Sequence, residues 1–134
     1  LSITSLGDLL RDIKLLREKF SHTYQRVWFD IPLLTQPAYQ QITLLPESYQ
    51  EIHKENIKYM REYSGHKEGF DGFKDFEIQK MLRNLAIWRN EKTDLTLEKR
   101  NFYAFFKEHD RRRGTNFLNT FPEMEEFWME CKNA

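Results

Sequence analysis

The chain has 134 residues, with 21 Lys and Arg against 21 Asp and Glu, so its formal net charge is zero. This balance argues against general nucleic-acid binding, which normally needs a basic excess. The length suits one domain, or a fragment of one, with a modest core. The lone cysteine, Cys131, excludes an internal disulfide framework and a cysteine-rich metal site. No apolar run approaches the roughly 18 residues of a membrane span, so we expect no membrane partner and a cytoplasmic location.

The first half of the chain predicts one helix followed by two short strands. Leucines recur at helical spacing from Ser5 to Phe20, which predicts an amphipathic helix. Side chains then alternate over Val27–Ile31, a pattern typical of a strand, and Pro32 ends it. A second extended run over Gln41–Leu45 is closed by Pro46. Two short strands do not stabilise themselves in water, so we expect them to need partners elsewhere.

The second half predicts four more helices and one glycine-containing linker. Apolar periodicity and stop signals delimit helices over 46–63, 75–90, 94–113 and, after a T-x-x-E capping box at Thr120 and Glu123, about 122–131. Three glycines within eight positions predict a flexible linker near 64–73. The expected fold class is α+β and helix-dominated, with about five helices and two short strands in a single domain or domain fragment.

Three consecutive arginines, Arg111, Arg112 and Arg113, are the most conspicuous charged group. Guanidinium groups offer two-pronged donors for phosphate or carboxylate, so the run is a candidate anion-binding site. Cations at a helix C-terminus also complement its dipole, and successive helical residues point about 100° apart. Both interpretations stay open, and Gly114 is suited to end the helix.

Trp28 and Asp30 would share one face of the first predicted strand. At the C-terminal end of a parallel barrel strand such residues would face a substrate, so both are substrate-side candidates. A packed indole and a turn carboxylate are the alternative. No pair of the four histidines has helical metal-site spacing, and Cys131 lies on an apolar helix face. We therefore expect no catalytic, metal or cofactor residue in this chain and do not expect it to be an enzyme by itself.

Three stretches together resemble a known family. They are RVWFDIPLLTQPAYQQITLLPESY (26–49), the helix EIHKENIKYMREY that follows, and DRRRGTNFLNTFPEMEEFW (110–128). They look like the C-terminal part of radical SAM enzymes with a twitch-type C-terminal region. The resemblance covers most of residues 5–130, and the closing R-R-G-T-N-F-x-x-T-F-P-E run is its most distinctive piece.

The resemblance implies the C-terminal part of a partial α/β barrel with a helical cap. In a longer parent, three cysteines would hold a [4Fe–4S] cluster that binds S-adenosylmethionine. This chain lacks the Cys-x3-Cys-x2-Cys motif, so no cluster or cofactor residue is carried over. The resemblance therefore implies a non-catalytic portion that closes the barrel, shapes the substrate side and packs on the N-terminal barrel portion of its parent. The start at Leu1 and the two orphan strands agree with a fragment.

A second function comes from a different class. The chain could be a free-standing helical protein-binding or assembly domain, with the aromatic stripes of its last two helices as the partner surface. A nucleic-acid module that uses the arginine run is disfavoured by the zero net charge.

Overall fold

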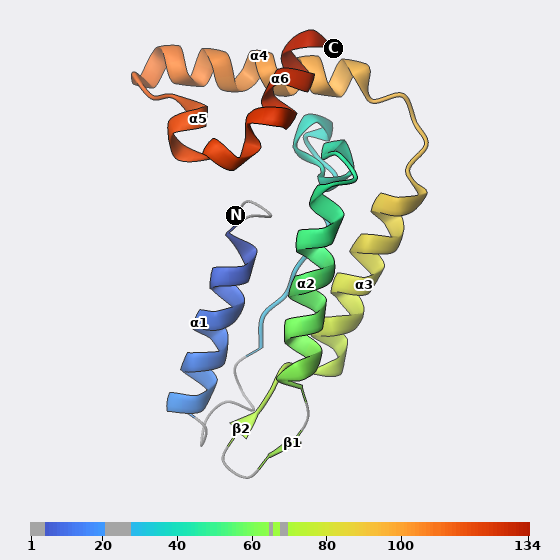
Figure 1. Ribbon diagram of the computed structural model, residues 1–134, viewed down its shortest axis with the longest axis vertical. Coiled ribbons are helices and arrows are strands. Elements are labelled where there is room, and N and C mark those ends of the chain that lie inside the picture. Colours follow the sequence, from blue (N-terminus) through green and yellow to red (C-terminus); the bar gives the residue numbers. More distant parts are fainter. Residues whose placement is uncertain (1–4, 21–27, 65, 68–69) are drawn as a thin grey trace. The chain divides into compact units, whose positions relative to one another are not determined.

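The computed structural model describes residues 5–20, 28–64, 66–67 and 70–134, and most of these are helical (Figure 1). The helix-dominated, aromatic-rich character predicted from the sequence is thereby confirmed. The α-helices among these residues are α1 (Leu6–Lys19), α2 (Tyr49–Glu62), α3 (Asp75–Asn90), α4 (Thr96–Arg113), α5 (Phe117–Thr120) and α6 (Glu125–Asn133). Short 3-10 helices are η2 (Ala38–Gln40), η3 (Ile42–Leu44) and η4 (Pro122–Met124). Within these ranges, no helix is both long and apolar enough to cross a membrane.

Both predicted strands are wrong. Residue 27 lies outside the described residues, and residues 28–31 carry no strand or helix assignment. The backbone N–H of Phe29 donates to the Glu77 carboxylate at 3.3 Å, where a strand would donate to a neighbouring strand. Over 41–45 the chain forms η3, with the N–H of Leu45 donating to the carbonyl of Ile42 at 3.1 Å. Side-chain alternation therefore marked an extended segment and a tight turn, not paired strands.

The expected piece of an α/β barrel is also wrong. In the part of the chain that the structure covers, the strands are β1 (His66–Lys67) and β2 (Phe70–Asp71). They pair antiparallel, with His66 opposite Asp71. A barrel is built from several strands closed into a cylinder, and a hairpin of two two-residue strands between α2 and α3 supplies none of them.

The chain divides into two compact units, which are described separately. Unit 1 comprises Leu1–Pro32 and Glu47–Arg89, and unit 2 comprises Leu33–Pro46 and Asn90–Ala134. A single domain or domain fragment stays a prediction. The linker predicted near 64–73 falls on the hairpin inside unit 1, and its positions 65, 68 and 69 lie outside the described residues, so its flexibility stays a prediction too.

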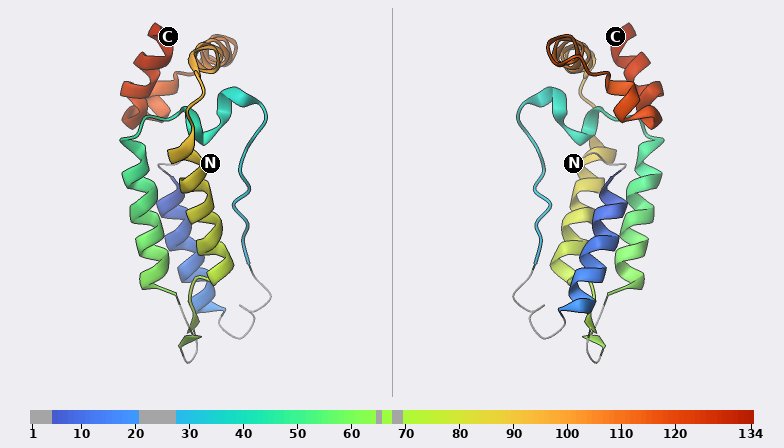
Figure 2. Two further views of the ribbon diagram at one scale, coloured as in Figure 1. Left: turned by 90° about the vertical axis from the view of Figure 1, so that its right-hand side faces the viewer. Right: turned by 90° about the vertical axis from the view of Figure 1, so that its left-hand side faces the viewer.

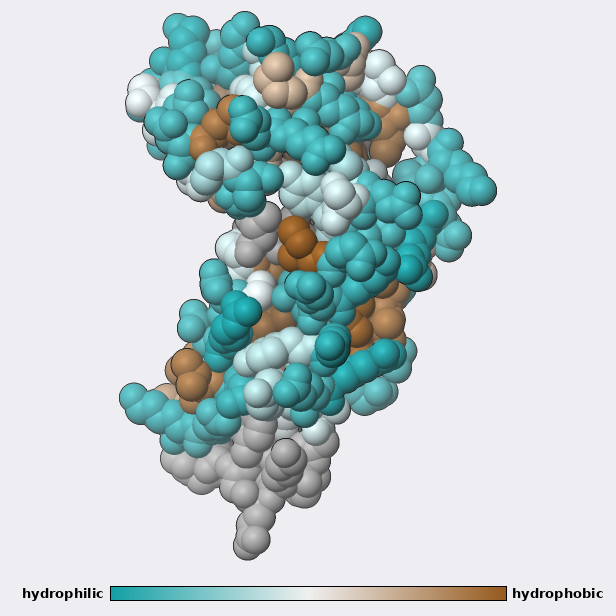
Figure 3. All heavy atoms as spheres, viewed as in Figure 1, coloured by the Kyte–Doolittle hydropathy of each residue, from teal (hydrophilic) through white to brown (hydrophobic). Residues whose placement is uncertain are grey.

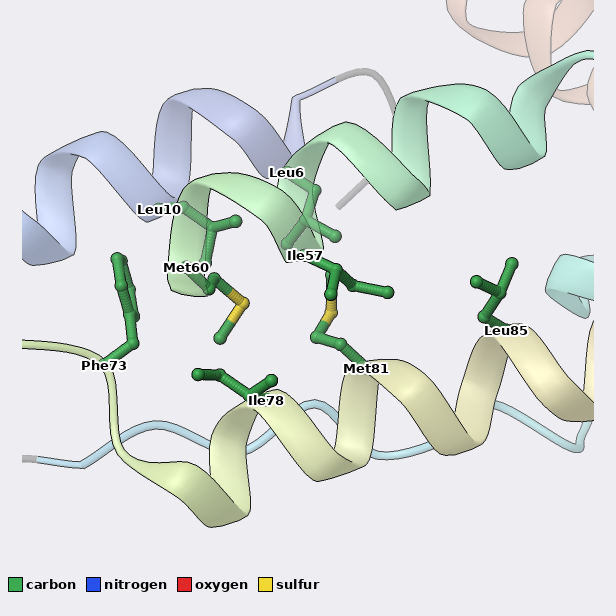
Figure 4. Packing of buried hydrophobic residues seen from close by; sticks show 8 residues of the cluster. All are labelled: Leu6, Leu10, Ile57, Met60, Phe73, Ile78, Met81 and Leu85. Carbon is green, nitrogen blue, oxygen red and sulfur yellow. The ribbon is translucent and has the colours of Figure 1, made fainter. Parts of the chain in front are cut away.

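Unit 1 is built on α1, α2 and α3, which lie side by side with α2 and α3 antiparallel (Figures 1 and 2). Their apolar stripes meet in one core, shown in Figure 4, of Leu6, Leu10, Ile57, Met60, Phe73, Ile78, Met81 and Leu85. Phe73 lies just before the N-terminus of α3 and is held there because its N–H donates to the carbonyl of Tyr63 at 2.9 Å. At the adjacent Gly72, a Cβ would lie 1.7 Å from that same oxygen, so only glycine allows this close approach.

Unit 2 has an aromatic core formed by α4, α5 and α6. The ring of Phe102 lies 4.9 Å from that of Phe127 and 5.6 Å from that of Phe117, and Phe117 stacks on Trp128 at 4.8 Å. The predicted capping box is wrong, since Thr120 belongs to α5 and α6 begins without a side-chain cap. Instead, Asn116 caps α5 by accepting a hydrogen bond from the N–H of Asn119 at 3.0 Å.

Candidate functional site

A buried ion pair joins α1 to α3 inside unit 1. Arg17 Nη1 lies 2.9 Å from Glu77 Oε2, and Arg17 Nη2 lies 2.5 Å from Glu77 Oε1. The side chains are 2% and 0% exposed. Arg17 also donates to the carbonyl of Gly72 at 3.3 Å, and Glu77 accepts from the backbone N–H of Lys74 at 2.9 Å. These contacts tie α1 to the start of α3, which gives the buried ion pair a structural role within unit 1.

Sequence reasoning missed this pair, although a signal was present. Arg17 continues the spacing of the buried residues Leu6 and Leu10 with Ile13, at i, i+4, i+7 and i+11, so a charged residue occupies the core-facing stripe of α1. Rings flank its guanidinium, with the centroid of Phe29 at 5.6 Å and that of Phe73 at 5.8 Å. An arginine on an apolar stripe indicates a buried partner, but its identity, 60 residues further on, is set only by the fold.

The predicted substrate-side residues Trp28 and Asp30 both contact α3. The indole of Trp28 packs edge-on against Phe76 at 6.1 Å, and Asp30 forms an ion pair with Lys80. That hydrogen bond lowers the pKa of the Asp30 carboxyl. Trp28 and Asp30, two residues apart on the extended segment, therefore contact Phe76 and Lys80, which lie four residues apart on α3. These two contacts hold the extended segment against α3, and Trp28 remains 69% exposed. A substrate-side role for Trp28 and Asp30 stays a prediction.

The predicted arginine cluster closes α4. Gly114 ends the helix in the left-handed conformation, at φ 63°, as its sequence position predicts. Arg111 Nε lies 2.7 Å from Glu108 Oε2, and Arg112 Nε lies 2.6 Å from Glu108 Oε1. Hydrogen bonds from Arg111 and Arg112 lower the pKa of Glu108 to about 2. Two of the three guanidiniums therefore share one carboxylate, and anion binding by Arg111, Arg112 and Arg113 stays a prediction.

One side of α4 forms a shallow hollow next to these arginines. We call it the α4 face, and it is lined by Ala104, Phe105, Glu108, His109, Arg112 and Arg113. Phe105 is 41% exposed and lies against Tyr39 of η2, with ring centroids 5.3 Å apart. The imidazole of His109 stacks on Phe105 at 6.4 Å with an interplanar angle of 27°. His109 itself is exposed.

His53 and Cys131 are both buried, and histidine and cysteine are side chains that often act in catalysis. His53 is 1% exposed, and its Nε2 lies 3.0 Å from the carbonyl oxygen of Met81, so it is the core histidine of unit 1. Burial lowers its pKa and favours the neutral ring. Burial also raises the pKa of the Cys131 thiol to about 12, which suppresses thiolate chemistry. Among residues 5–20, 28–64, 66–67 and 70–134, no three His, Cys, Asp or Glu side chains gather as metal ligands.

No family model matches this sequence, no curated protein matches it, and no solved structure matches it. The resemblance to radical SAM proteins therefore stays a prediction. On the α4 face the structure brings an exposed aromatic ring, a histidine and two arginines together on an accessible surface.

Proposed function

We propose that this chain is a helical protein-binding or assembly domain whose docking surface is the α4 face. The observation that carries the proposal is the low burial of α4. Of its 18 residues, Phe102 is the buried one, whereas a helix that packs on a core normally buries a continuous apolar stripe. A long, regular helix with so little of its surface used by its own unit is suited to receive a partner.

The chemistry of the α4 face agrees with this role. Protein interfaces concentrate their binding energy in a few aromatic and arginine side chains with a polar rim. Here Phe105 and His109 form an exposed stacked pair beside Arg112 and Arg113. The ring of Tyr39 packs against that of Phe105 and restrains it before a partner arrives, which reduces the entropy cost of docking.

The docking surface differs from the one that the sequence suggested. The aromatic stripes of the last two helices were expected to face a partner, but Phe102, Phe117 and Phe127 pack on one another inside unit 2. The aromatic side chain of α4 left exposed on the α4 face is Phe105. On the side drawn in Figure 3, the surface over α4 is mainly hydrophilic.

The proposed function does not use the role that the radical SAM resemblance implies. Its specific expectation was a late barrel strand with Trp28 and Asp30 at the strand end. Because residues 28–31 are not a strand, barrel closure is not part of the proposal.

The experiment is photo-crosslinking from the α4 face. Benzoylphenylalanine is introduced at Phe105 and, as a matched control on unit 1, at the exposed Leu15 of α1. After irradiation of cells that produce the chain, we expect a discrete protein adduct from position 105 and none of the same mass from position 15.

The charge reversal R112E/R113E in the chain labelled at Phe105 supplies the specificity test. We expect it to reduce the adduct at least fivefold, because a docked partner must meet both the ring and the arginines. Absence of a discrete adduct from position 105, or an equal yield of it from position 15, would overturn the proposed function.

A further inference from the structure

Unit 2 is electrically polarised between two of its helices. Six basic and three acidic side chains give α4 a net charge of +3. Residues 122–133, which form η4 and α6, hold four glutamates and one lysine, a net charge of −3. The two helices already pack together on one side, with Lys99 Nζ 2.5 Å from Glu130 Oε1 and Arg100 donating to the carbonyl of Ala134 at 2.7 Å.

The outer side of α6 repeats this acidic chemistry at the surface. Met129 is 42% exposed, and Glu125 and Glu126 precede it by four and three residues, so all three lie on one helix face. Both glutamates are exposed, and neither forms an ion pair with any residue that the structure describes. We call these three residues the α6 face.

The α4 face carries the complementary pattern in the same spacing. Arg112 and Arg113 follow His109 by three and four residues, as Glu126 and Glu125 precede Met129. If α6 of another molecule lay antiparallel on the α4 face, Met129 would meet the stacked rings of Phe105 and His109. Glu126 would then come opposite Arg112, and Glu125 opposite Arg113.

Each part of this contact is favourable on general grounds. Thioether sulfur makes stabilising contacts with aromatic rings, and opposite charges in register add specificity. Antiparallel docking also brings the positive N-terminal end of the α6 dipole beside the negative C-terminal end of α4. The basic α4 face of one molecule is therefore complementary in charge to the acidic α6 face of another.

We propose that the occupant of the α4 face is the α6 face of a second copy of this chain, which makes the chain a head-to-tail self-assembling protein. This inference rests on the proposed function of the α4 face and names its partner. Because the two faces differ, a docked pair still presents one free α4 face and one free α6 face, so assembly grows with concentration or closes as a ring.

The test is a charge-swap experiment with the full chain in analytical ultracentrifugation. For wild type we expect a weight-average mass that rises with concentration and falls at high salt. R112E/R113E and E125R/E126R should each weaken association at least tenfold, because each places like charges in contact. Mixed one to one, the variants restore opposite charges at both contacts, so association should return to near wild-type strength. Reversal of the exposed pair Glu51 and Lys54 on α2 should leave association unchanged.

Circular dichroism of each variant shows whether α4 and α6 still fold, and the recovery in the mixture could not come from unfolded chains. Wild type that stays at the mass of one chain at every concentration, or a mixture that does not associate, would overturn self-assembly. The proposed function is judged separately, because a crosslink from Phe105 to a different protein supports the α4 face and rejects the second copy.

Discussion

Arg17 and Glu77 face each other across the base of unit 1 in a two-point ion pair, with N–O distances of 2.9 and 2.5 Å and almost no solvent exposure. The same carboxylate accepts the backbone N–H groups of Phe29 and Lys74. One side chain of α3 thus holds α1, the extended segment and the start of its own helix.

Removing one member of this pair should be far more costly than removing both. We expect Glu77→Ala to lower the free energy of unfolding by about 3–5 kcal/mol, because the Arg17 charge is then buried without its counterion. The double variant R17M/E77L, which fills the space with apolar groups, should be closer to wild type. Urea denaturation followed by circular dichroism measures both, and equal losses would show that the charge itself is not what matters.

Gly72 and Gly114 allow a paired test of whether an added Cβ collides with the backbone. A Cβ at Gly72 would collide with the carbonyl of Tyr63, whereas a Cβ at Gly114 would meet nothing within 4 Å. Gly114→Ala should therefore cost about 1 kcal/mol, since only its left-handed φ is unfavourable for alanine. Gly72→Ala should lower the melting temperature several times more. Similar melting temperatures for the two variants would contradict the tight approach of Tyr63 and Gly72.

His53 should make the stability of unit 1 depend on pH. Its pKa is lowered in the folded chain, so below its ordinary value of about 6.5 the unfolded state binds the proton first. The contribution of neutral His53 to the free energy of unfolding is therefore fully present above about pH 6.5, and it is lost as the pH falls toward the lowered pKa of the folded chain. We expect His53→Gln, which can still donate to the carbonyl of Met81, to flatten the unfolding free energy between pH 7 and 5.

A wild-type curve that is already flat over this range would show that His53 is protonated as easily in the folded as in the unfolded chain.

The Glu108 carboxyl should titrate far below the usual range of a glutamate. Its pKa is lowered to about 2 by Arg111 and Arg112, and carbon-13 NMR of the side-chain carboxyl follows it directly. In R111A/R112A we expect the midpoint to return toward the ordinary value of about 4.3. A wild-type midpoint near 4.3 would mean that the two arginines do not hold Glu108, and it would leave all three arginines of the cluster free for an anion.

Helices α1 and α3 were readable from the sequence because each buries one stripe. The periodic leucines of 5–20 and the apolar series over 75–90 predict α1 and α3 to within a residue at either end. The strands failed for a related reason. Alternation over 27–31 records that neighbouring side chains face different surroundings, and an extended segment fastened to α3 by Trp28 and Asp30 meets that condition as well as a strand does.

The candidate site was only partly readable. The arginine run and its closing Gly114 were visible, but the sharing of Glu108 between Arg111 and Arg112 depends on rotamers that no pattern encodes. The exposure of Phe105 was hidden for another reason. Phe102, Phe105 and Phe106 look equivalent in sequence, and the packing of α5 and α6 decides which ring is covered.

The assignment of residues to the two units has a practical consequence for dissecting the chain. Residues 33–46 separate the two stretches of unit 1 in sequence but belong to unit 2, where Tyr39 packs on Phe105. Neither unit is a continuous stretch, so a fragment cut at residue 90 would leave Phe105 without its supporting ring. A covalent splice that joins 33–46 to 90–134 through a short linker would preserve that contact and yield unit 2 as a separate polypeptide.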